Sequence, residues 1–362
     1  MAFSLSTSYP VVYRAKYSKQ KWKGEYLEKP HKTPKEEAAM TPAQREALTA
    51  SRNCFDDMPL VNYTTQYGLS CFEGLKAFPQ KDGGLSLFRP DRNAARFYNS
   101  MKGLFMPPFP EDLFVKAVVE TVKKNAKLGF RPYYDAKWEK DSFMAADAVY
   151  LRPFVHTEGG IGVNISKEPY VVIVSTLVGA YFSGSDAGAL VTERIRATPK
   201  GTGWIKAASN YTIAALAKHE AIDAGFMECI FLDAVHHKYV EEGSSCNIFF
   251  YLKSGELVTP ELGDTILPGI TRSSIIDLAK AKKVKVSERK IAIEEALSEA
   301  RECFVAGTAA GAVPVPSITY KKKKTVFNKA KVGELTADLR DTLKGIQYGN
   351  IQGPKGWMMK VI

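Results

Sequence analysis

A glycine- and serine-rich segment near the middle of the sequence sets the strongest limit on how this chain can fold. Residues 179–188 read Gly-Ala-Tyr-Phe-Ser-Gly-Ser-Asp-Ala-Gly, a composition typical of a flexible connector. The chain has 362 residues, which exceeds the usual size of a single hydrophobic core. We therefore predict a small N-terminal domain at residues 1–178, a linker at 179–189 and a larger C-terminal domain at 190–362.

Both halves carry signals for strands and for helices, which predicts an α/β fold. In the first half, apolar spacing predicts a helix at 111–128, and short apolar runs predict strands at 85–88, 148–156 and 170–178. In the second half the signals alternate, with helices predicted at 210–224, 271–281 and 333–347 and strands at 227–233, 246–252 and 303–306. Residues 1–60 are polar and contain several prolines, so we expect an irregular extension that wraps a domain.

The net charge of +11 requires that a negatively charged partner be considered. The most basic run, residues 321–324, has no interleaved aromatic residue or glycine, so we interpret it as a solvated turn and expect no nucleic-acid partner. A small anionic cofactor is an equally good use for part of the excess charge. No run of about 20 apolar residues occurs, so we expect no membrane span.

The cysteines and the N-terminus bear on location. Five cysteines without C-x-x-C spacing indicate free thiols in a reducing compartment and argue against a disulfide framework or a metal site. The first 24 residues lack Asp and Glu and contain Arg14 and several lysines, which is typical of a mitochondrial transit peptide, but Pro10 interrupts an amphipathic helix. We expect a cytoplasmic protein, with a mitochondrial one as the alternative.

Lys206 is the first candidate for chemistry. It lies in Gly201-Thr-Gly-Trp-Ile-Lys206 and is followed by Ala-Ala-Ser. A lysine among small residues, without a nearby carboxylate, can be partly buried, which lowers its pKa and makes the neutral amine nucleophilic. A lysine that forms a Schiff base needs this property. An exposed lysine in a glycine turn is the alternative.

Two acids stand at the start of a predicted strand, in Glu241-Glu242-Gly-Ser-Ser-Cys-Asn247. Adjacent side chains of a strand point to opposite faces, so we expect one acid to face inward and to need a partner. A pyridinium nitrogen is a suitable partner, because the charge pair keeps such a ring able to accept electrons. A solvated acidic turn is the alternative.

Two small-residue segments are candidates for a phosphate site. Leu267-Pro-Gly-Ile-Thr-Arg272 opens a predicted helix, whose free N–H groups and dipole favour an anion. Ala306-Gly-Thr-Ala-Ala-Gly311 ends a predicted strand, where backbone can approach a ligand closely. Ordinary helix capping and turn formation explain the same residues. Four aromatic residues and an arginine could likewise line a pocket with one polar wall or serve as core and surface: Tyr67, Phe72, Tyr150, Tyr181 and Arg152.

Taken in order, eight segments between Tyr63 and Tyr348 resemble the branched-chain aminotransferases, which are pyridoxal-phosphate enzymes of fold type IV. They are Phe72-Glu-Gly-Leu-Lys-Ala-Phe78, Tyr150-Leu-Arg-Pro153, Gly201-Thr-Gly-Trp-Ile-Lys206, Ser209-Asn-Tyr211, Glu242-Gly-Ser-Ser-Cys-Asn247, Leu267-Pro-Gly-Ile-Thr-Arg272, Gly307-Thr-Ala309 and Gln347-Tyr-Gly349. Each segment alone is weak, but eight in register are a specific signal. The resemblance implies a two-domain α/β (α+β) fold like that of D-amino-acid aminotransferase, with the cofactor at the domain interface.

By this resemblance the cofactor is pyridoxal 5'-phosphate. Lys206 would form a Schiff base with its aldehyde and, once released by substrate, would move the proton between Cα and the cofactor carbon. Tyr211 would hydrogen-bond the phenolic oxygen, and Glu242 would pair with the pyridine nitrogen. The remaining cofactor contacts implied are Arg96, Ser245, Ile270, Thr271 and Thr308.

The resemblance also implies the substrates, L-leucine, L-isoleucine and L-valine with 2-oxoglutarate, which give branched-chain 2-oxo acids and L-glutamate. Phe72, Tyr150 and Tyr181 match walls of the side-chain pocket. Tyr67 and the Ala309 backbone match contacts for the α-carboxylate, and Arg152 would receive the second carboxylate of glutamate. Ile161 and Val163 match loop residues that reach the neighbouring subunit's pocket, which implies a homodimer.

One departure and two alternatives remain. The C-x-x-C of the family's animal members is replaced here by Ala310 and Val313, so we expect no thiol switch. A D-amino-acid aminotransferase or aminodeoxychorismate lyase would share the lysine, the glutamate and the phosphate cup, although Tyr150-Leu-Arg-Pro153 favours the branched-chain enzymes. A basic binding protein without catalysis is the alternative from another class, supported by the charge of +11.

Overall fold

The chain divides into two compact units, each of which has its own sheets and core. The computed structural model describes residues 8–179, 187–308 and 311–362. The first unit comprises Met1–Tyr181 and Gly345–Ile362, and the second comprises Phe182–Lys344. The division thus falls inside the predicted linker. The prediction that everything after residue 190 belongs to the second domain is wrong for the last 18 residues (345 to 362), which belong to the first unit.

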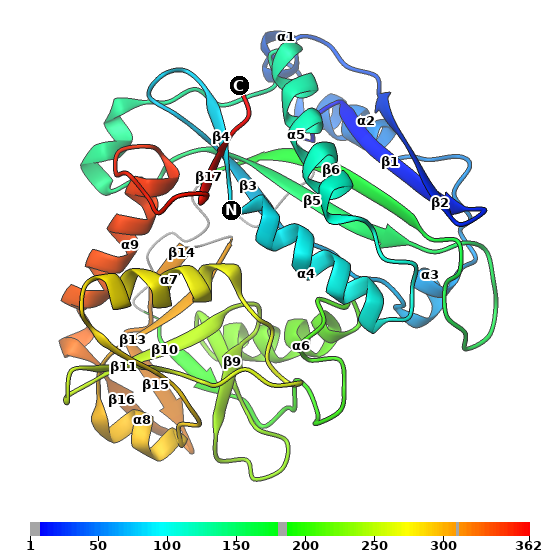
Figure 1. The fold of residues 1–362 in the computed structure, drawn as a ribbon. Coiled ribbons are helices and arrows are strands. Elements are labelled where there is room, and N and C mark those ends of the chain that lie inside the picture. Colours follow the sequence, from blue (N-terminus) through cyan, green and yellow to red (C-terminus); the bar gives the residue numbers. More distant parts are fainter. Residues whose placement is uncertain (1–7, 180–186, 309–310) are drawn as a thin grey trace. The chain divides into compact units, whose positions relative to one another are not determined.

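The described strands of the first unit form one seven-stranded sheet in the order β17-β4-β3-β5-β6-β1-β2 (Figure 1). All its neighbouring strands pair antiparallel. The bounds are β1 Val11–Ser18, β2 Lys21–Glu28, β3 Leu75–Pro79, β4 Leu85–Phe88, β5 Ala148–His156, β6 Tyr170–Val178 and β17 Met358–Lys360. The C-terminal residues join this unit because β17 pairs with β4, a contact too short and too distant in sequence to be predicted from pattern.

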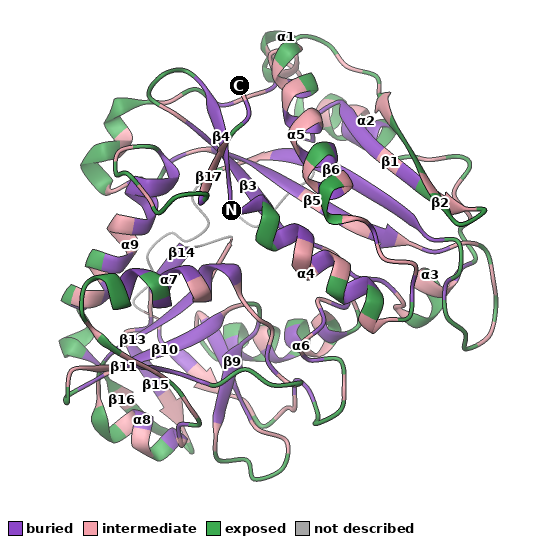
Figure 2. Cartoon of the chain, in the orientation of Figure 1, coloured by how far each residue is buried: buried purple, intermediate pink, exposed green. Residues whose placement is uncertain are grey.

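Helices pack on this sheet through apolar faces. They are α1 Pro34–Ala38, α2 Pro42–Arg52, α3 Tyr63–Tyr67, α4 Pro90–Gly103 and α5 Glu111–Lys127, with the 3-10 turn η2 Ala136–Asp141. The buried side of α5 is the predicted one, with Phe114, Ala117, Val118, Thr121 and Val122. Asn125 on the same helix bonds both Val11 N and Val11 O at 2.9 Å, which fixes α5 to β1. Figure 2 shows the central strands β3, β5 and β6 largely buried.

The prediction that residues 1–60 are an irregular extension is wrong. Residues 11–28 form the hairpin β1–β2, and β1 pairs with β6 inside the sheet. Val11, Val12, Tyr13 and Ala15 are buried. Lysines alternate with these apolar residues and with Tyr17 and Trp22, so average polarity concealed a strand pattern. Residues 34–38 and 42–52 are helices that begin at the capping boxes of Thr33 and Thr41.

In the described part of the second unit, the strands form two five-stranded sheets. One has the order β12-β11-β10-β13-β14, and the other has the order β16-β15-β7-β8-β9. The strands are β7 Ala189–Val191, β8 Glu228–Leu232, β9 Val240–Gly243, β10 Asn247–Leu252, β11 Glu256–Thr259, β12 Lys285–Glu288, β13 Ala300–Gly307, β14 Gly311–Pro314, β15 Ser317–Tyr320 and β16 Lys323–Val326. The helices are α6 Asn210–Asp223, α7 Ile270–Ala281, α8 Ile293–Glu299 and α9 Glu334–Gln347, with the turn η3 Asn328–Ala330.

The predicted α/β class is confirmed, and so are the helices and strands predicted beyond residue 80. Buried, β-branched strands such as β5 and β6 match their predicted bounds. The core of the second unit lies around β10, where Ile248 and Phe250 are fully buried together with Val305 of β13 at 2% exposure. Strand β9, which carries the two candidate acids, packs against β10. Sheet and core thus fix the backbone on which the acids stand.

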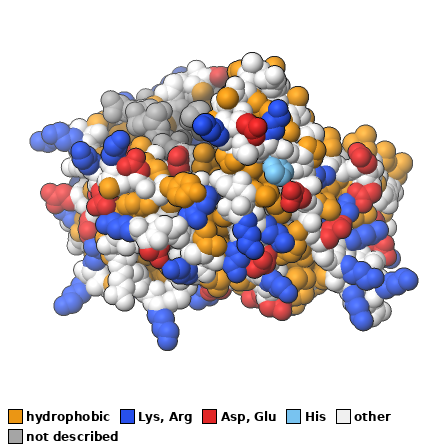
Figure 3. Space-filling view, turned by 90° about the horizontal axis from the view of Figure 1, so that it is seen from above, with side chains coloured by type: hydrophobic (Ala, Val, Ile, Leu, Met, Phe, Trp, Pro, Cys, Tyr) orange, Lys and Arg blue, Asp and Glu red, His pale blue; other side chains and the backbone are white. Residues whose placement is uncertain are grey.

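The four-lysine run lies where a solvated turn was expected. Lys321 and Lys322 form the turn between β15 and β16, both with positive φ, and all four lysines are exposed. On the face seen in Figure 3, Lys and Arg side chains are scattered and mixed with Asp and Glu. Within the described ranges, no helix combines the length and the apolar character that crossing a bilayer requires.

Candidate active site

Lys206 ends a loop that is fixed to the start of helix α6. Asn210 Nδ2 donates to Thr202 O at 2.7 Å and to Ile205 O at 3.0 Å, and Thr202 Oγ1 donates to Asn210 Oδ1 at 2.7 Å. Lys206 is half-buried, and its neighbours Ile205 and Ala207 are buried. Its Nζ donates to the Tyr211 hydroxyl at 2.7 Å. The structure therefore brings together the predicted amine and the predicted phenol.

Glu242 is buried on β9 beside an arginine that the sequence did not single out. Its Oε1 lies 2.6 Å from Arg196 Nη1, and each of the two side chains is 3% exposed. Glu242 also accepts the Leu267 N–H at 3.3 Å and the Asn247 Nδ2 at 3.2 Å. Burial raises the pKa of the Glu242 carboxyl, while Arg196, the Leu267 N–H and the charge of Lys206 oppose that rise.

Arg196 could have been found only by asking which cation balances a buried Glu242. It lies ten residues before Lys206, in a segment without a recognisable motif. Its Nη1 also donates to Thr265 O at 3.2 Å. Its Nε is buried and has no hydrogen-bond partner among the described residues. Arg196 thus presents a donor that a bound group could satisfy.

Both adjacent acids are buried, whereas we had expected only one to face inward. Glu241 is 6% exposed and Glu242 is 3% exposed. The alternative of a solvated acidic turn is therefore wrong for both residues. Ser245, two residues beyond Gly243, is exposed in the bend that links β9 to β10.

The first turn of helix α7 has the features of an anion site. Gly269 is its N-cap, and no side chain caps the helix. A Cβ at Gly269 would lie 1.9 Å from Asn247 Oδ1, so the close approach of the two segments requires glycine. Ile270 and Thr271 follow, and both are buried. The first N–H groups of a helix lack intrahelical acceptors and favour an anion. Thr308, the other predicted phosphate contact, is half-buried just after β13.

In the first unit, the structure groups three of the predicted substrate residues. Tyr150 and Arg152 lie on the same face of β5, and Arg152 Nη2 donates to the Tyr150 hydroxyl at 2.7 Å. The Arg152 guanidinium also lies 4.7 Å from the centre of the Phe72 ring. This arginine is therefore held against two aromatic side chains by a hydroxyl and by cation–π contact.

Arg96 is held by a buried glutamate that the sequence did not reveal. Arg96 Nε and Nη2 donate to Glu73 Oε1 and Oε2 at 2.6 and 2.9 Å. Glu73 is fully buried and also accepts Asn93 Nδ2 at 2.8 Å. This bidentate pair fixes the direction of the Arg96 side chain on α4. No sequence signal linked positions 23 residues apart.

Two loops of the first unit carry exposed apolar side chains. Ile161 and Val163, predicted to reach a second subunit, are 77% and 95% exposed. The Tyr67 side chain is 44% exposed, and its hydroxyl accepts the Gly162 N–H at 2.9 Å. Tyr181 and Ala309 lie outside the described residues. In the described part of the chain, no cluster of three or more His, Cys, Asp or Glu could hold a metal ion.

Comparison with known proteins gives one consistent result. Residues 70–318 match the family model of amino-transferase class IV. A branched-chain-amino-acid aminotransferase of Mycolicibacterium smegmatis is 38% identical over 307 residues, which cover 82% of this chain and 80% of that protein.

Solved structures agree. A branched-chain aminotransferase from Thermoproteus uzoniensis with norvaline has a TM-score of 0.72 and 27% identity, over 85% of this chain and 95% of that one. A second branched-chain amino acid aminotransferase, complexed with N-(5'-phosphopyridoxyl)-L-glutamate and from the source abbreviated T.th., has a TM-score of 0.70 and 28% identity, over 85% and 94% of the two chains.

The Arg196–Glu242 pair makes a testable prediction about stability. Arg196→Met leaves the Glu242 carboxyl buried without its cation, and breaking a buried pair costs about 3–5 kcal/mol. Because burial raises the pKa of Glu242 above its unfolded value, the folded variant holds a proton that the unfolded chain has released. Stability is therefore lost as pH rises, and the deficit should be larger at pH 8 than at pH 5.

Urea-induced unfolding at the two pH values measures this difference. Arg196→Lys, which keeps a positive charge, is the matched control and should show the smaller dependence on pH. An Arg196→Met deficit of equal size at both pH values would mean that the arginine does not compensate the carboxylate.

Proposed function

Because the chain belongs to the class IV aminotransferase family and to its branched-chain-amino-acid members, we propose that it transfers the amino groups of L-leucine, L-isoleucine and L-valine to 2-oxoglutarate. The products are the branched-chain 2-oxo acids and L-glutamate. One observation carries the proposal: a lysine amine 2.7 Å from a tyrosine hydroxyl and a buried glutamate paired with arginine occur in the same unit. Amino-group transfer through a carbonyl cofactor needs these groups.

Three features of the second unit fit pyridoxal 5'-phosphate. Glu242 supplies a buried acid for the ring nitrogen, and the uncapped first turn of α7 supplies N–H donors for a phosphate. Arg196 Nε is a buried donor without a partner among the described residues. When bound, this cofactor supplies an aldehyde carbon that takes up the amino group and a ring that accepts electrons.

Lys206 would be the catalytic residue. Its amine would hold the cofactor through the aldehyde carbon and, when displaced by substrate, would take the proton from the substrate Cα and return it. The bond to the Tyr211 hydroxyl supports this role, because it holds Nζ in one place. Tyr211 would then donate to the phenolic oxygen of the cofactor. Glu242, held by Arg196 and by the Leu267 N–H, would keep the ring nitrogen protonated.

The remaining cofactor contacts would hold the phosphate. We assign the Ile270 N–H and the Thr271 and Thr308 hydroxyls to it, with Arg96 as the cation and Ser245 as a further hydroxyl. The buried Glu73 supports the choice of Arg96, because a guanidinium with two donors already fixed has a defined direction. A charged donor gives a hydrogen bond to phosphate about twice as strong as a neutral one.

Substrate recognition would rest on the cluster around Arg152. The pocket must hold an apolar branched chain and the second carboxylate of glutamate in turn. Arg152 bonds Tyr150 and lies against Phe72, so its charge has partners when a branched chain is bound. For glutamate, the guanidinium would turn its donors to the carboxylate. Tyr181 would complete the wall, and Tyr67 and the Ala309 backbone would contact the α-carboxylate.

A homodimer would use the exposed loops of the first unit. Leu60 and Val61 are 82% and 53% exposed, and Ile161 and Val163 belong to the loop that pairs with them. The Gly160 N–H donates to Val61 O at 3.2 Å, so the two loops present one apolar surface. Such a surface is typical of a protein–protein contact, and a second copy is its simplest occupant.

We place the protein in the cytoplasm. All five of its cysteines are free, and three of them are buried, which suits a reducing compartment.

Lys206→Ala should abolish transamination and leave the fold intact. The purified wild-type protein with added pyridoxal phosphate should be yellow, and borohydride should fix the cofactor covalently at Lys206. The variant should show neither property, because no other lysine replaces its amine. Lys200→Gln, in the same loop but exposed, should behave like the wild type. A wild-type protein that stays colourless with added cofactor would favour a non-catalytic binder.

Arg152→Ala should impair glutamate far more than leucine. Losing a hydrogen bond to a charged group costs about 2 kcal/mol, which is roughly a 30-fold loss in kcat/KM for glutamate alone. Steady-state kinetics with each amino donor measure the two losses. Tyr150→Phe, which removes only the hydroxyl that holds Arg152, should give a smaller differential. Equal losses on both donors would rule out a role in carboxylate binding, and activity on D-alanine alone would favour the D-amino-acid enzymes.

Val163→Asp should shift the protein from dimer to monomer. Val163 is 95% exposed, so the change places a charge in the proposed interface without disturbing a core. Sedimentation velocity gives the assembly state. Val326→Asp, at a 50% exposed residue of β16, is the control and should leave the dimer unchanged. A Val163→Asp dimer as stable as the wild type would exclude this surface from the interface.

A further inference from the structure

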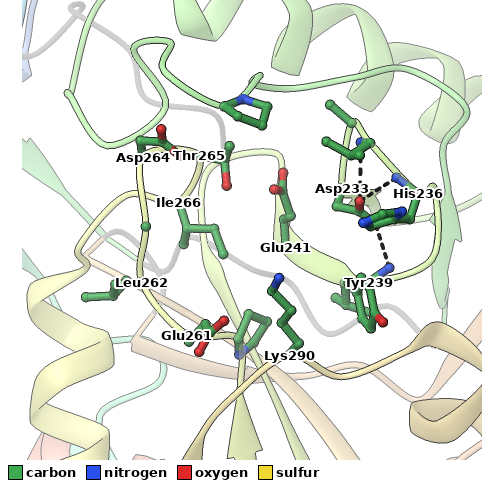
Figure 4. Close-up of a pocket in the computed structure, with 16 residues that line it drawn as sticks. Asp233, His236, Tyr239, Glu241, Glu261, Leu262, Asp264, Thr265, Ile266 and Lys290 are labelled. Atoms are coloured by element: carbon green, nitrogen blue, oxygen red, sulfur yellow. Dashed lines mark hydrogen bonds between the residues drawn. The ribbon is translucent and has the colours of Figure 1, made fainter.

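The second unit has a cavity that the proposed reaction does not use. Its volume is about 230 Å³, and it is lined by residues 233–236, 239–241 and 260–266 together with Pro199 and Lys290. Figure 4 shows Glu241 between the loop of residues 261–266 on one side and Asp233 and His236 on the other. Glu242 does not line it, because neighbouring side chains of β9 point to opposite faces.

Carboxylates dominate the charge of this cavity. Among the described residues that line it are Asp233, Glu241, Glu261 and Asp264, against the single basic side chain of Lys290. The protein already uses two of these acids. Asp233 accepts the backbone N–H groups of four residues between 235 and 239. Asp264 accepts the Lys200 N–H at 2.5 Å.

Glu241 differs from those two acids. Its side chain lines the cavity, the residue is 6% exposed, and its buried Oε2 has no hydrogen-bond partner among the described residues. Burial raises the pKa of Glu241 to about 7, and the Thr265 side chain opposes the rise. A buried carboxylate without a counter-ion is costly. A cation delivered by a ligand would offset that cost.

The rest of the lining selects an organic cation over a metal ion. Val235 and Leu262 are 60% and 44% exposed at the cavity, and Ile266 adds a buried apolar wall. None of the acidic groups in the described residues is arranged to hold a metal ion. The volume is below the roughly 300 Å³ at which pockets for drug-sized ligands begin. A ligand of amino-acid size or smaller therefore fits.

We propose that this cavity binds a small organic ammonium ion, whose N–H donates to the Glu241 carboxylate while its carbon atoms lie against Val235, Leu262 and Ile266. The terminal torsion of a glutamate is soft, so Oε2 can turn toward the ligand at little cost. A simple amine and the ammonium group of an amino acid share this chemistry. An amino acid would add a carboxylate within the same cavity as Lys290.

The occupant would lie beside the loop that positions the candidate active site. Thr265 O, in the cavity wall, accepts from Arg196 at 3.2 Å. Asp264 O accepts the Trp204 N–H at 3.1 Å, two residues before Lys206. The binding site itself stands on the cavity and on Glu241 and does not depend on the reaction proposed above.

Isothermal titration calorimetry with trimethylammonium tests the proposal. This probe keeps one N–H donor and cannot condense with an aldehyde, so it does not react with a carbonyl cofactor. We expect saturable binding at pH 8 and about tenfold weaker binding at pH 6, because Glu241 with a pKa of about 7 is mostly protonated at the lower pH. The neutral tert-butanol, of the same shape, should not bind.

Two variants locate the site. Glu241→Gln keeps the shape of the side chain and should abolish binding, whereas Glu261→Gln, at an exposed residue of the same wall, should change affinity by less than about threefold. N,N-dimethylglycine distinguishes the sources: tighter binding than trimethylammonium assigns the site to amino acids, and weaker binding assigns it to simple amines. Absence of binding at pH 8, equal binding by Glu241→Gln, or equal binding of tert-butanol would overturn the proposal.

Discussion

The buried ion pair between Glu242 and Arg196 ties together the segments that make up the candidate active site. Water cannot stabilise either charge, so each needs the other and further hydrogen bonds. Those bonds come from Leu267 and Asn247 to the carboxylate and from Arg196 to Thr265 O. The pair therefore links strand β9, the loop before helix α7 and the segment that leads to Lys206. A change at any of these segments is felt by the same two charges.

Two arginines of the first unit illustrate how a partner decides what a guanidinium can do. Arg96 has two donors fixed by the fully buried Glu73, so its direction is set before any ligand arrives. Arg152 rests on a tyrosine hydroxyl and on the Phe72 ring, neutral partners that a carboxylate can outcompete. The first arrangement suits a permanent anion such as a cofactor phosphate. The second suits a carboxylate that must come and go with each substrate.

Local patterns allowed much of the fold to be predicted, and distant partners account for what was missed. Strands β5 and β6 are buried along most of their length, so apolar β-branched runs gave their bounds. The hairpin at residues 11–28 was missed because lysines on its exposed positions masked the alternation. Lys206 and Tyr211 are five residues apart and could be paired by motif. Arg196 and Glu73 could not be found, because each is defined by a partner 23 or more residues away. The C-terminal strand was misassigned for the same reason, since only its pairing with β4 reveals its unit.

Glu241 and Glu242 show how far apart the environments of two adjacent identical residues can be. Both are buried, and burial raises the pKa of each. On one face of β9, Arg196 and two hydrogen-bond donors compensate the charge of Glu242. On the other face, Glu241 lines a cavity rich in acids and keeps an oxygen without a partner among the described residues. A sequence pattern reports only that two acids stand on a strand. The supply of cations on each face decides which carboxylate is ionised, and therefore which one can hold a positively charged group.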